Sequence, residues 1–71
     1  MPQPKTWIYR YAYHAKWSPE DGEYIGTCDE FPSLSSLAPL AHQAIADLEQ
    51  LVSTVIEDMI ASGESLPLPS T

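Results

Sequence analysis

Residues 39–62 read PLAHQAIADLEQLVSTVIEDMIAS, and this stretch decides the fold because no other part of the chain keeps a helical period over such a length. Its apolar residues recur at gaps of three, four and seven, which is the period of an α-helix with one buried side. The apolar stripe is wider than a coiled-coil seam, which favours a helix that lies on a sheet with a second surface beside it. The apolar positions are Leu40, Ala41, Ala44, Ile45, Leu48, Leu51, Val52, Val55, Ile56, Met59 and Ile60.

The ends of this helix are marked by residues that favour helix termini. Gly63 follows the last apolar pair, where a left-handed residue closes a helix at least cost. The prolines at 67 and 69 then prevent continuation. At the start, Ser36 is a candidate cap for a first turn that contains Pro39. We therefore predict a helix over Pro39–Ser62.

Upstream of the helix, the pattern changes to a period of two. From Thr6 to Trp17, aromatic residues alternate with other types, which is typical of a strand. The turn Ser18–Gly22 combines proline with glycine, and Glu23–Cys28 is a second strand, so these runs predict a hairpin. Gly26 inside the second strand indicates a bulge or a close contact.

The remaining segments complete a small mixed fold. A short third strand, Leu34–Leu37, leads into the helix, and the prolines of the tail Gly63–Pro69 confine it to a sheet edge or a solvated arm. The predicted fold is α+β, with a three- to four-stranded antiparallel sheet packed on one long helix in the order β-β-β-α-(β). The 71 residues make a single domain over 6–71, after an arm at 1–5 that we expect to be disordered.

The charge of the chain is strongly negative and unevenly placed. The formal net charge is -7, and Lys5, Arg10 and Lys16 all precede the first of the ten acidic residues. Such a chain is a poor ligand for phosphate backbones, so we expect no direct nucleic-acid binding. Long-range attraction instead favours a basic partner.

Cysteine usage and hydropathy indicate the compartment. Cys28 is the only cysteine, which excludes an internal disulfide and favours a reducing environment. Residues 1–5 hold two prolines and no apolar run, and no stretch approaches the length of a membrane span. We therefore expect a cytoplasmic protein without membrane contact. The wide apolar stripe in so short a chain also favours a homo-oligomer, most simply a dimer.

The residue types that carry catalysis and metal binding are present, but their spacing is unproductive. Carboxylate pairs fall at Glu20/Asp21 and Asp29/Glu30, a turn and a strand exit where solvated acids are ordinary. The histidines and the cysteine are metal-ligand types that lie far apart in sequence. They are His14, Cys28 and His42. We expect no catalytic, cofactor-binding or metal site, hence no cofactor and no enzyme.

Four short motifs follow one another along the chain. They are Asp21-Gly22-Glu23-Tyr24, Glu30-Phe31-Pro32, Gln43-Ala44-Ile45 and Gly63-Glu64-Ser65-Leu66-Pro67-Leu68-Pro69-Ser70. Together they resemble the HicB-like antitoxin domain of type II toxin–antitoxin systems, over Tyr9 to Ser70. The chain departs from the family pattern at Ser33, where a glycine is usual, and at Gln43, where an acid is usual.

The resemblance implies a truncated RNase H-like fold, dimers formed through this domain, and a non-catalytic function. In that function the domain binds and silences a small toxin that cleaves RNA. Because no residue follows Thr71, we do not expect the DNA-binding segment that many members carry. An RNA-binding toxin presents positive charge, so acidic side chains near the hairpin tip and the strand exit are the candidate contacts. They are Glu20, Asp21, Glu23, Asp29 and Glu30.

Two other functions stay open from the sequence. One is a stand-alone homo-oligomeric domain without a toxin partner, either structural or binding a small ligand in an aromatic-lined cleft. The other is a metal-dependent hydrolase on a reduced RNase H-like sheet, for which Asp21, Asp29 and Asp47 are the candidate acids.

Overall fold

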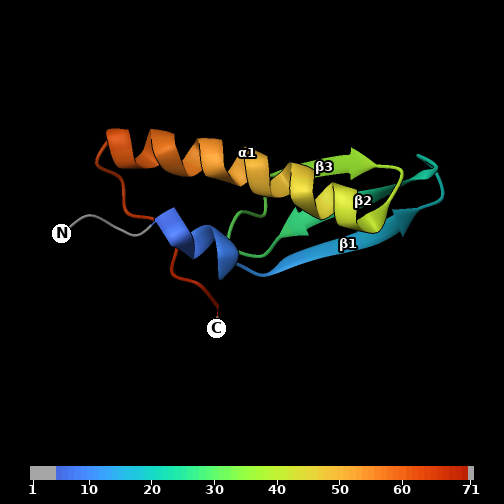
Figure 1. Ribbon diagram of the computed structural model, residues 1–71, viewed down its shortest axis with the longest axis horizontal. Coiled ribbons are helices and arrows are strands. Elements are labelled where there is room, and N and C mark those ends of the chain that lie inside the picture. The colour runs from blue at the N-terminus through green and yellow to red at the C-terminus, as the bar shows by residue number, and fades with distance from the viewer. Residues whose placement is uncertain (1–4, 71) are drawn as a thin grey trace.

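A three-stranded antiparallel sheet is covered on one face by a single long helix in the computed structural model, which describes residues 5–70 (Figure 1). The elements in chain order are the 3-10 helix η1 (Lys5–Tyr9), the strands β1 (Tyr13–Ser18), β2 (Glu23–Cys28) and β3 (Ser35–Ala38), and the helix α1 (Ala41–Ala61). The strands lie in the order β1-β2-β3. The predicted α+β fold is confirmed, and within the described residues the tail adds no fourth strand. Of the predicted arm, residues 1–4 lie outside the described part.

The hairpin of β1 and β2 is closed as the turn residues predict. Tyr13 pairs with Cys28 at one end of the hairpin and Ser18 pairs with Glu23 at the other. Gly22 has a φ of 65°, in the left-handed region that glycine adopts without strain. Its N–H donates to the carbonyl oxygen of Ser18 at 2.9 Å, which fixes the turn.

The first half of the predicted strand Thr6–Trp17 is wrong. Residues 5–9 form η1, and the N–H groups of Arg10 and Tyr11 both donate to the carbonyl oxygen of Trp7. Ile8 and Tyr11 are buried, so the period of burial here is three and not two. The reason is the length of the partner strand: β2 ends opposite Tyr13, and the chain before it packs against α1 instead of pairing.

The third strand and the start of α1 are shifted from their predicted positions. β3 begins at Ser35, one residue later than expected. α1 begins at Ala41, two residues later than expected, because Pro39 and Leu40 connect the sheet to the helix. Leu40 occupies the N-cap position in an extended conformation, without a side-chain cap. Ser36 is therefore not the cap; it lies in β3, and its hydroxyl donates to the carbonyl oxygen of Ala44 at 2.6 Å.

The C-terminal end of α1 agrees with the prediction. Gly63 has a φ of 75°, and its N–H donates to the carbonyl oxygen of Ile60. The N–H of Glu64 reaches back to the carbonyl oxygen of Met59 at 2.8 Å. These two bonds form a Schellman motif, in which a left-handed residue satisfies the last carbonyls of a helix.

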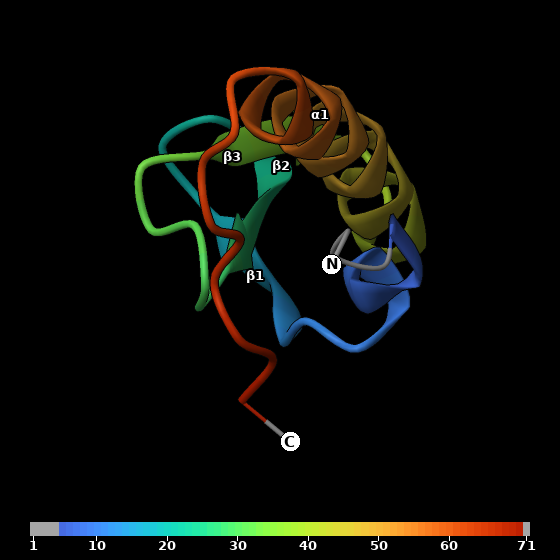
Figure 2. The same ribbon diagram turned by 90° about the vertical axis from the view of Figure 1, so that its left-hand side faces the viewer.

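The core is asymmetric along the helix. α1 buries one residue per turn, at Ala44, Leu48, Val52 and Ile56. Its C-terminal half extends past the sheet (Figure 1). η1, the loop after β2 and the tail pack beneath α1 there (Figure 2). The tail is neither an edge strand nor a solvated arm, because Leu66 is buried in this core. No helix among residues 5–70 is both long and apolar enough to cross a membrane.

Near its N-terminal end, α1 approaches the sheet closely at Gly26. A Cβ at this position would lie 2.7 Å from the carbonyl oxygen of Ala44 and 2.7 Å from the hydroxyl of Ser36. The predicted close contact is therefore confirmed, and glycine is required there because the helix backbone fills the space of a side chain.

Candidate functional site

The five candidate acids lie at two ends of the sheet, not in one cluster. Glu20 and Asp21 are in the turn between β1 and β2, and Glu23 begins β2. Asp29 and Glu30 directly follow the other end of β2. Glu23 and Asp29 are six positions apart along the strand direction, which corresponds to about 20 Å. The two groups therefore lie where the sequence placed them, at the hairpin tip and at the strand exit, and each group is considered alone.

Glu30 is an internal structural residue. One carboxylate oxygen accepts hydrogen bonds from the N–H of Ala12 at 2.9 Å and from the thiol of Cys28 at 3.5 Å. The other oxygen accepts from the N–H and the hydroxyl of Ser70, at 2.8 and 2.6 Å. Glu30 thus ties β1 and the tail together, and its carboxylate has little capacity left for a partner.

The hydrogen bonds at Glu30 also set its ionisation. Partial burial by itself raises the pKa of this carboxyl, but the bonds from Ser70 and from the N–H of Ala12 outweigh burial and lower the pKa to about 2. The carboxylate is therefore charged at every physiological pH, and the tail is held by charge-assisted bonds.

Asp29 lies on the sheet face that α1 does not cover. Its carboxylate is 3.2 Å from the Nε2 of His14, and both side chains are more than half exposed. The residue before it, Cys28, points into the core, so alternation along the strand places Asp29 outside. An exposed pair of this kind stabilises a protein weakly, and Asp29 stays accessible to solvent.

The turn between β1 and β2 presents exposed acids beside exposed aromatic rings. Glu20 and Asp21 are both exposed, and Asp21 accepts a hydrogen bond from the Ser18 hydroxyl at 2.9 Å. Trp17 and Tyr24 pair across the strands, with ring centroids 5.2 Å apart at an interplanar angle of 70°. Trp17 is 48% exposed.

The sequence predicted Trp17 on an aromatic face but did not associate it with the turn acids. The signal was present, because Trp17 and Tyr24 flank the segment that carries Glu20 and Asp21. Two rings that bracket a short acidic turn must meet across the hairpin if the strands pair in register.

A hollow of about 420 Å³ lies between η1 and α1. Its size is that of a small-ligand site, although among residues 5–70 Tyr9 is the only aromatic residue that lines it. The other lining residues are Thr6, Ile8, Ala46, Glu49, Gln50 and Ser53.

The metal-ligand types are dispersed. Within residues 5–70, no group of three or more His, Cys, Asp or Glu side chains is placed to hold a metal ion. Cys28 is buried, and burial raises the pKa of its thiol, whereas His14 and His42 are exposed. Asp21 and Asp29 lie at opposite ends of β2. Asp47 is on the exposed side of α1.

No known protein family, curated protein or solved structure matches this chain. The HicB-like resemblance therefore depends on the short motifs quoted above.

Proposed function

We propose that this domain is a non-catalytic protein-binding module of the HicB-like antitoxin kind, which covers the basic RNA-binding surface of an RNA-cleaving partner in the cytoplasm. The observation that carries the proposal is the exposure of most of the acidic residues. Seven of the ten acidic residues are exposed. They are Glu20, Asp21, Asp29, Asp47, Glu57, Asp58 and Glu64.

The positions of these acids support a binding function of this kind. They lie in the hairpin turn, after β2, along the outer side of α1 and in the tail, so the negative potential is not confined to one element. A potential of one sign attracts a basic protein from a distance and raises its rate of association. The same charge repels RNA, so a partner held here is shielded from its substrate.

The test is co-expression with the product of the neighbouring reading frame, where that product is a small basic protein. We expect the two chains to purify together and the complex to lose the RNA cleavage of the partner alone. The association rate should fall steeply between about 50 and 200 mM salt, because exposed charges are screened beyond a Debye length of about 8–10 Å. Purification of the domain alone, with the partner fully active, would contradict the proposal.

Two observations support the second candidate function. The hollow between η1 and α1 is large enough for a small ligand, and six large apolar side chains among residues 5–70 are exposed and offer apolar surface for self-association. They are Tyr9, Trp17, Leu37, Leu40, Leu51 and Leu68. A shift in sedimentation coefficient on dilution would reveal a dimer. A dimer that binds no basic protein and is stabilised by a small molecule would favour this function.

A further inference from the structure

The turn end of the sheet carries a patch of exposed apolar surface with a charged rim. We propose that this turn-end patch, formed by Trp17 and Tyr24 and rimmed by Glu20 and Asp21, binds an arginine-bearing segment of a basic protein. The inference builds on the proposed function, because it names the surface through which the basic partner would be held.

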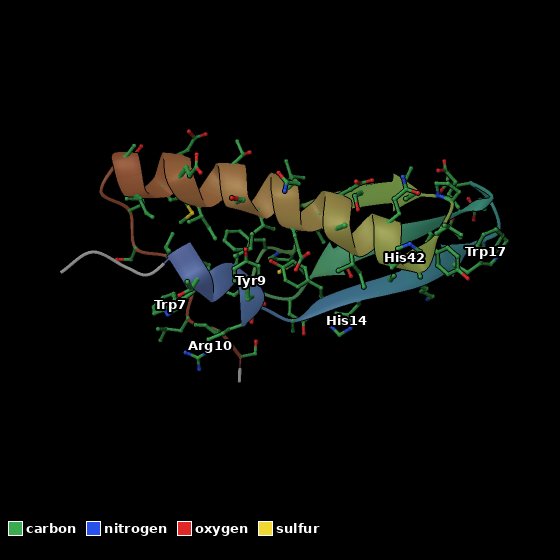
Figure 3. All side chains as sticks on the ribbon, in the orientation of Figure 1. Trp7, Tyr9, Arg10, His14, Trp17 and His42 are labelled. Carbon is green, nitrogen blue, oxygen red and sulfur yellow. The ribbon has the colours of Figure 1, made fainter. Side chains whose placement is uncertain are left out.

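The aromatic part of the patch is rigid. Trp17 and Tyr24 are paired residues of β1 and β2, and their rings meet edge to face at 5.2 Å. This contact supports the indole from one side while 48% of the Trp17 residue stays open to solvent. Figure 3 shows Trp17 at the turn end, far from Trp7, which lies at η1. A fixed and half-exposed tryptophan is the type of side chain that dominates binding energy at protein interfaces.

The charged rim is held in place by the turn itself. The hydroxyl of Ser18 donates to the Asp21 carboxylate at 2.9 Å, and the N–H of Gly22 closes the turn on the carbonyl of Ser18. Glu20 and Asp21 are both exposed. Only two residues lie between Trp17 and Glu20 in the sequence. The Asp21 carboxylate is therefore anchored to the same hairpin as the indole, and Glu20 is its neighbour in the turn.

Arginine is the side chain that matches both parts of this patch. Its planar guanidinium can stack on the face of a tryptophan and still donate hydrogen bonds from its edge to a carboxylate. Lysine offers a point charge without a stacking plane, so it fits the rim but not the ring as well. The chemistry of the patch thus selects an arginine-bearing partner over a merely basic one.

Two other occupants fit less well. Nucleic-acid bases stack on exposed tryptophans, but the phosphates beside them would meet the Glu20 and Asp21 carboxylates. A second copy of this chain, joined about a two-fold axis through Trp17, would bring the same two acids towards their own equivalents. The like charges oppose that arrangement at low salt.

The test uses the purified protein and a hexa-arginine peptide, with dissociation constants measured by titration calorimetry at low ionic strength. We expect Trp17→Ala to weaken binding at least tenfold and Trp17→Phe to restore part of the loss. The double variant Glu20→Gln/Asp21→Asn should weaken binding at least fivefold. A hexa-lysine peptide should bind at least threefold more weakly than hexa-arginine.

The matched control removes the same two charges at the other end of the molecule. Glu57 and Asp58 are adjacent, exposed and near the end of α1, so Glu57→Gln/Asp58→Asn should change peptide affinity less than twofold. Circular dichroism of each variant checks that the fold is retained. In a Trp7→Phe background, the fluorescence of Trp17 should change on titration with the peptide, which places the peptide at the patch without altering it.

Several results would overturn the assignment. Equal losses from the turn variants and the α1 control would show diffuse attraction to an acidic surface. Absence of hexa-arginine binding, unchanged Trp17 fluorescence, or a Trp17→Ala variant that loses only self-association would each exclude this patch as the site. None of these results depends on the neighbouring reading frame. Failure of co-purification therefore counts against the proposed function, whereas a peptide affinity that the turn variants leave unchanged counts against the patch.

Discussion

Two pairs of aromatic rings with nearly the same geometry lie in very different surroundings. Tyr11 and Phe31 meet at 5.3 Å and 78°, and Trp17 and Tyr24 meet at 5.2 Å and 70°. The first pair is buried, with residue exposures of 5% and 8%, whereas Trp17 is 48% exposed. The difference comes from the chain around each pair. η1, the loop after β2 and the tail enclose the first pair, whereas the second lies at the end of the hairpin beside the short turn Pro19–Gly22 and Ala38 of β3.

The comparison shows how one type of contact can have two uses in a small domain. At the tail end, where η1 and residues 64–70 pack under α1, an edge-to-face pair stabilises the fold through buried area. At the turn end, the same kind of pair leaves apolar surface exposed, and this surface forms the proposed arginine-binding patch. The predictions below test this division, from the largest expected effect to the smallest.

Phe31→Ala tests the buried pair. The change removes a ring that packs against Tyr11 and leaves a cavity, so the free energy of unfolding should fall by about 3–5 kcal/mol. That loss is most of the stability of a domain this small. Urea denaturation measures it. A loss below about 1 kcal/mol would mean that the tail end is no more tightly packed than the turn end.

Glu30→Gln tests the bonds that fix the tail beside that pair. Replacing one of the two acceptor oxygens by an amide NH2 group removes at least one hydrogen bond, from Ser70 or from the N–H of Ala12, and hydrogen bonds to a charged group contribute about 1.5–3 kcal/mol. The free energy of unfolding should fall by a similar amount at pH 7. Protease cleavage within residues 64–70 should become faster. Glu57→Gln, at an exposed acid without such bonds, is the control and should change neither measurement.

The same variant has a defined pH dependence. The pKa of Glu30 is about 2 in the folded protein and about 4.3 in an unfolded chain, so the folded state is stabilised where the carboxyl is ionised. This contribution is complete above about pH 5 and is lost as the pH falls towards 2. The stability difference between wild type and Glu30→Gln should therefore shrink between pH 5 and 3. A constant difference over that range would show that the ionised carboxylate is not the stabilising group.

Gly26→Ala tests the close approach of the helix that lies between the two ends. The new methyl group meets backbone oxygen of Ala44, which cannot rotate away, so α1 must shift. Overpacking of this kind costs about 1–3 kcal/mol. Amide hydrogen exchange should show the loss in the first turns of α1. Unchanged stability would mean that the N-terminal part of α1 is free to move off the sheet.

Trp17→Ala should have the smallest effect on folding. A half-exposed ring at the end of a hairpin contributes area and one aromatic contact, together about 1 kcal/mol or less. The ratio of the losses in free energy of unfolding for Trp17→Ala and Phe31→Ala measures how much less the exposed pair contributes to stability than the buried pair. A loss equal to that of Phe31→Ala would show that the exposed pair also has a structural use.

The parts of the fold that depend on local sequence were predictable. The period of α1, the Gly63 terminus and the turn with Gly22 follow from side chains within a few residues of one another. η1 was missed because alternation of aromatic residues from Trp7 to Tyr11 has the period of a strand, and only the end of β2 at Cys28 shows that no partner is present there. Local sequence does not report the length of a pairing strand.

The site was predictable in composition and not in geometry. The sequence picked out the exposed acids of the turn, but it grouped them with Glu30, whose bonds come from residues 12 and 70. Contacts over such separations are set by tertiary packing, so no spacing rule could have identified Glu30 as internal. Trp17 was missed as a residue of the proposed patch because its part in the patch depends on its exposure. The alternation of aromatic residues does not distinguish an exposed ring from a buried one.

The contact of Glu30 with Ser70 joins residues forty positions apart and closes the fold at its last described residue. During synthesis, the hairpin leaves the ribosome more than thirty residues before residues 64–70, whereas α1 ends only three residues before them. Domains complete their folding as units at the pace of translation. Leu66 then arrives late to cover Tyr11 and Phe31. A nascent chain stalled before Ser70 should therefore expose the apolar end of the molecule to chaperones, while its hairpin turn is already in its final form.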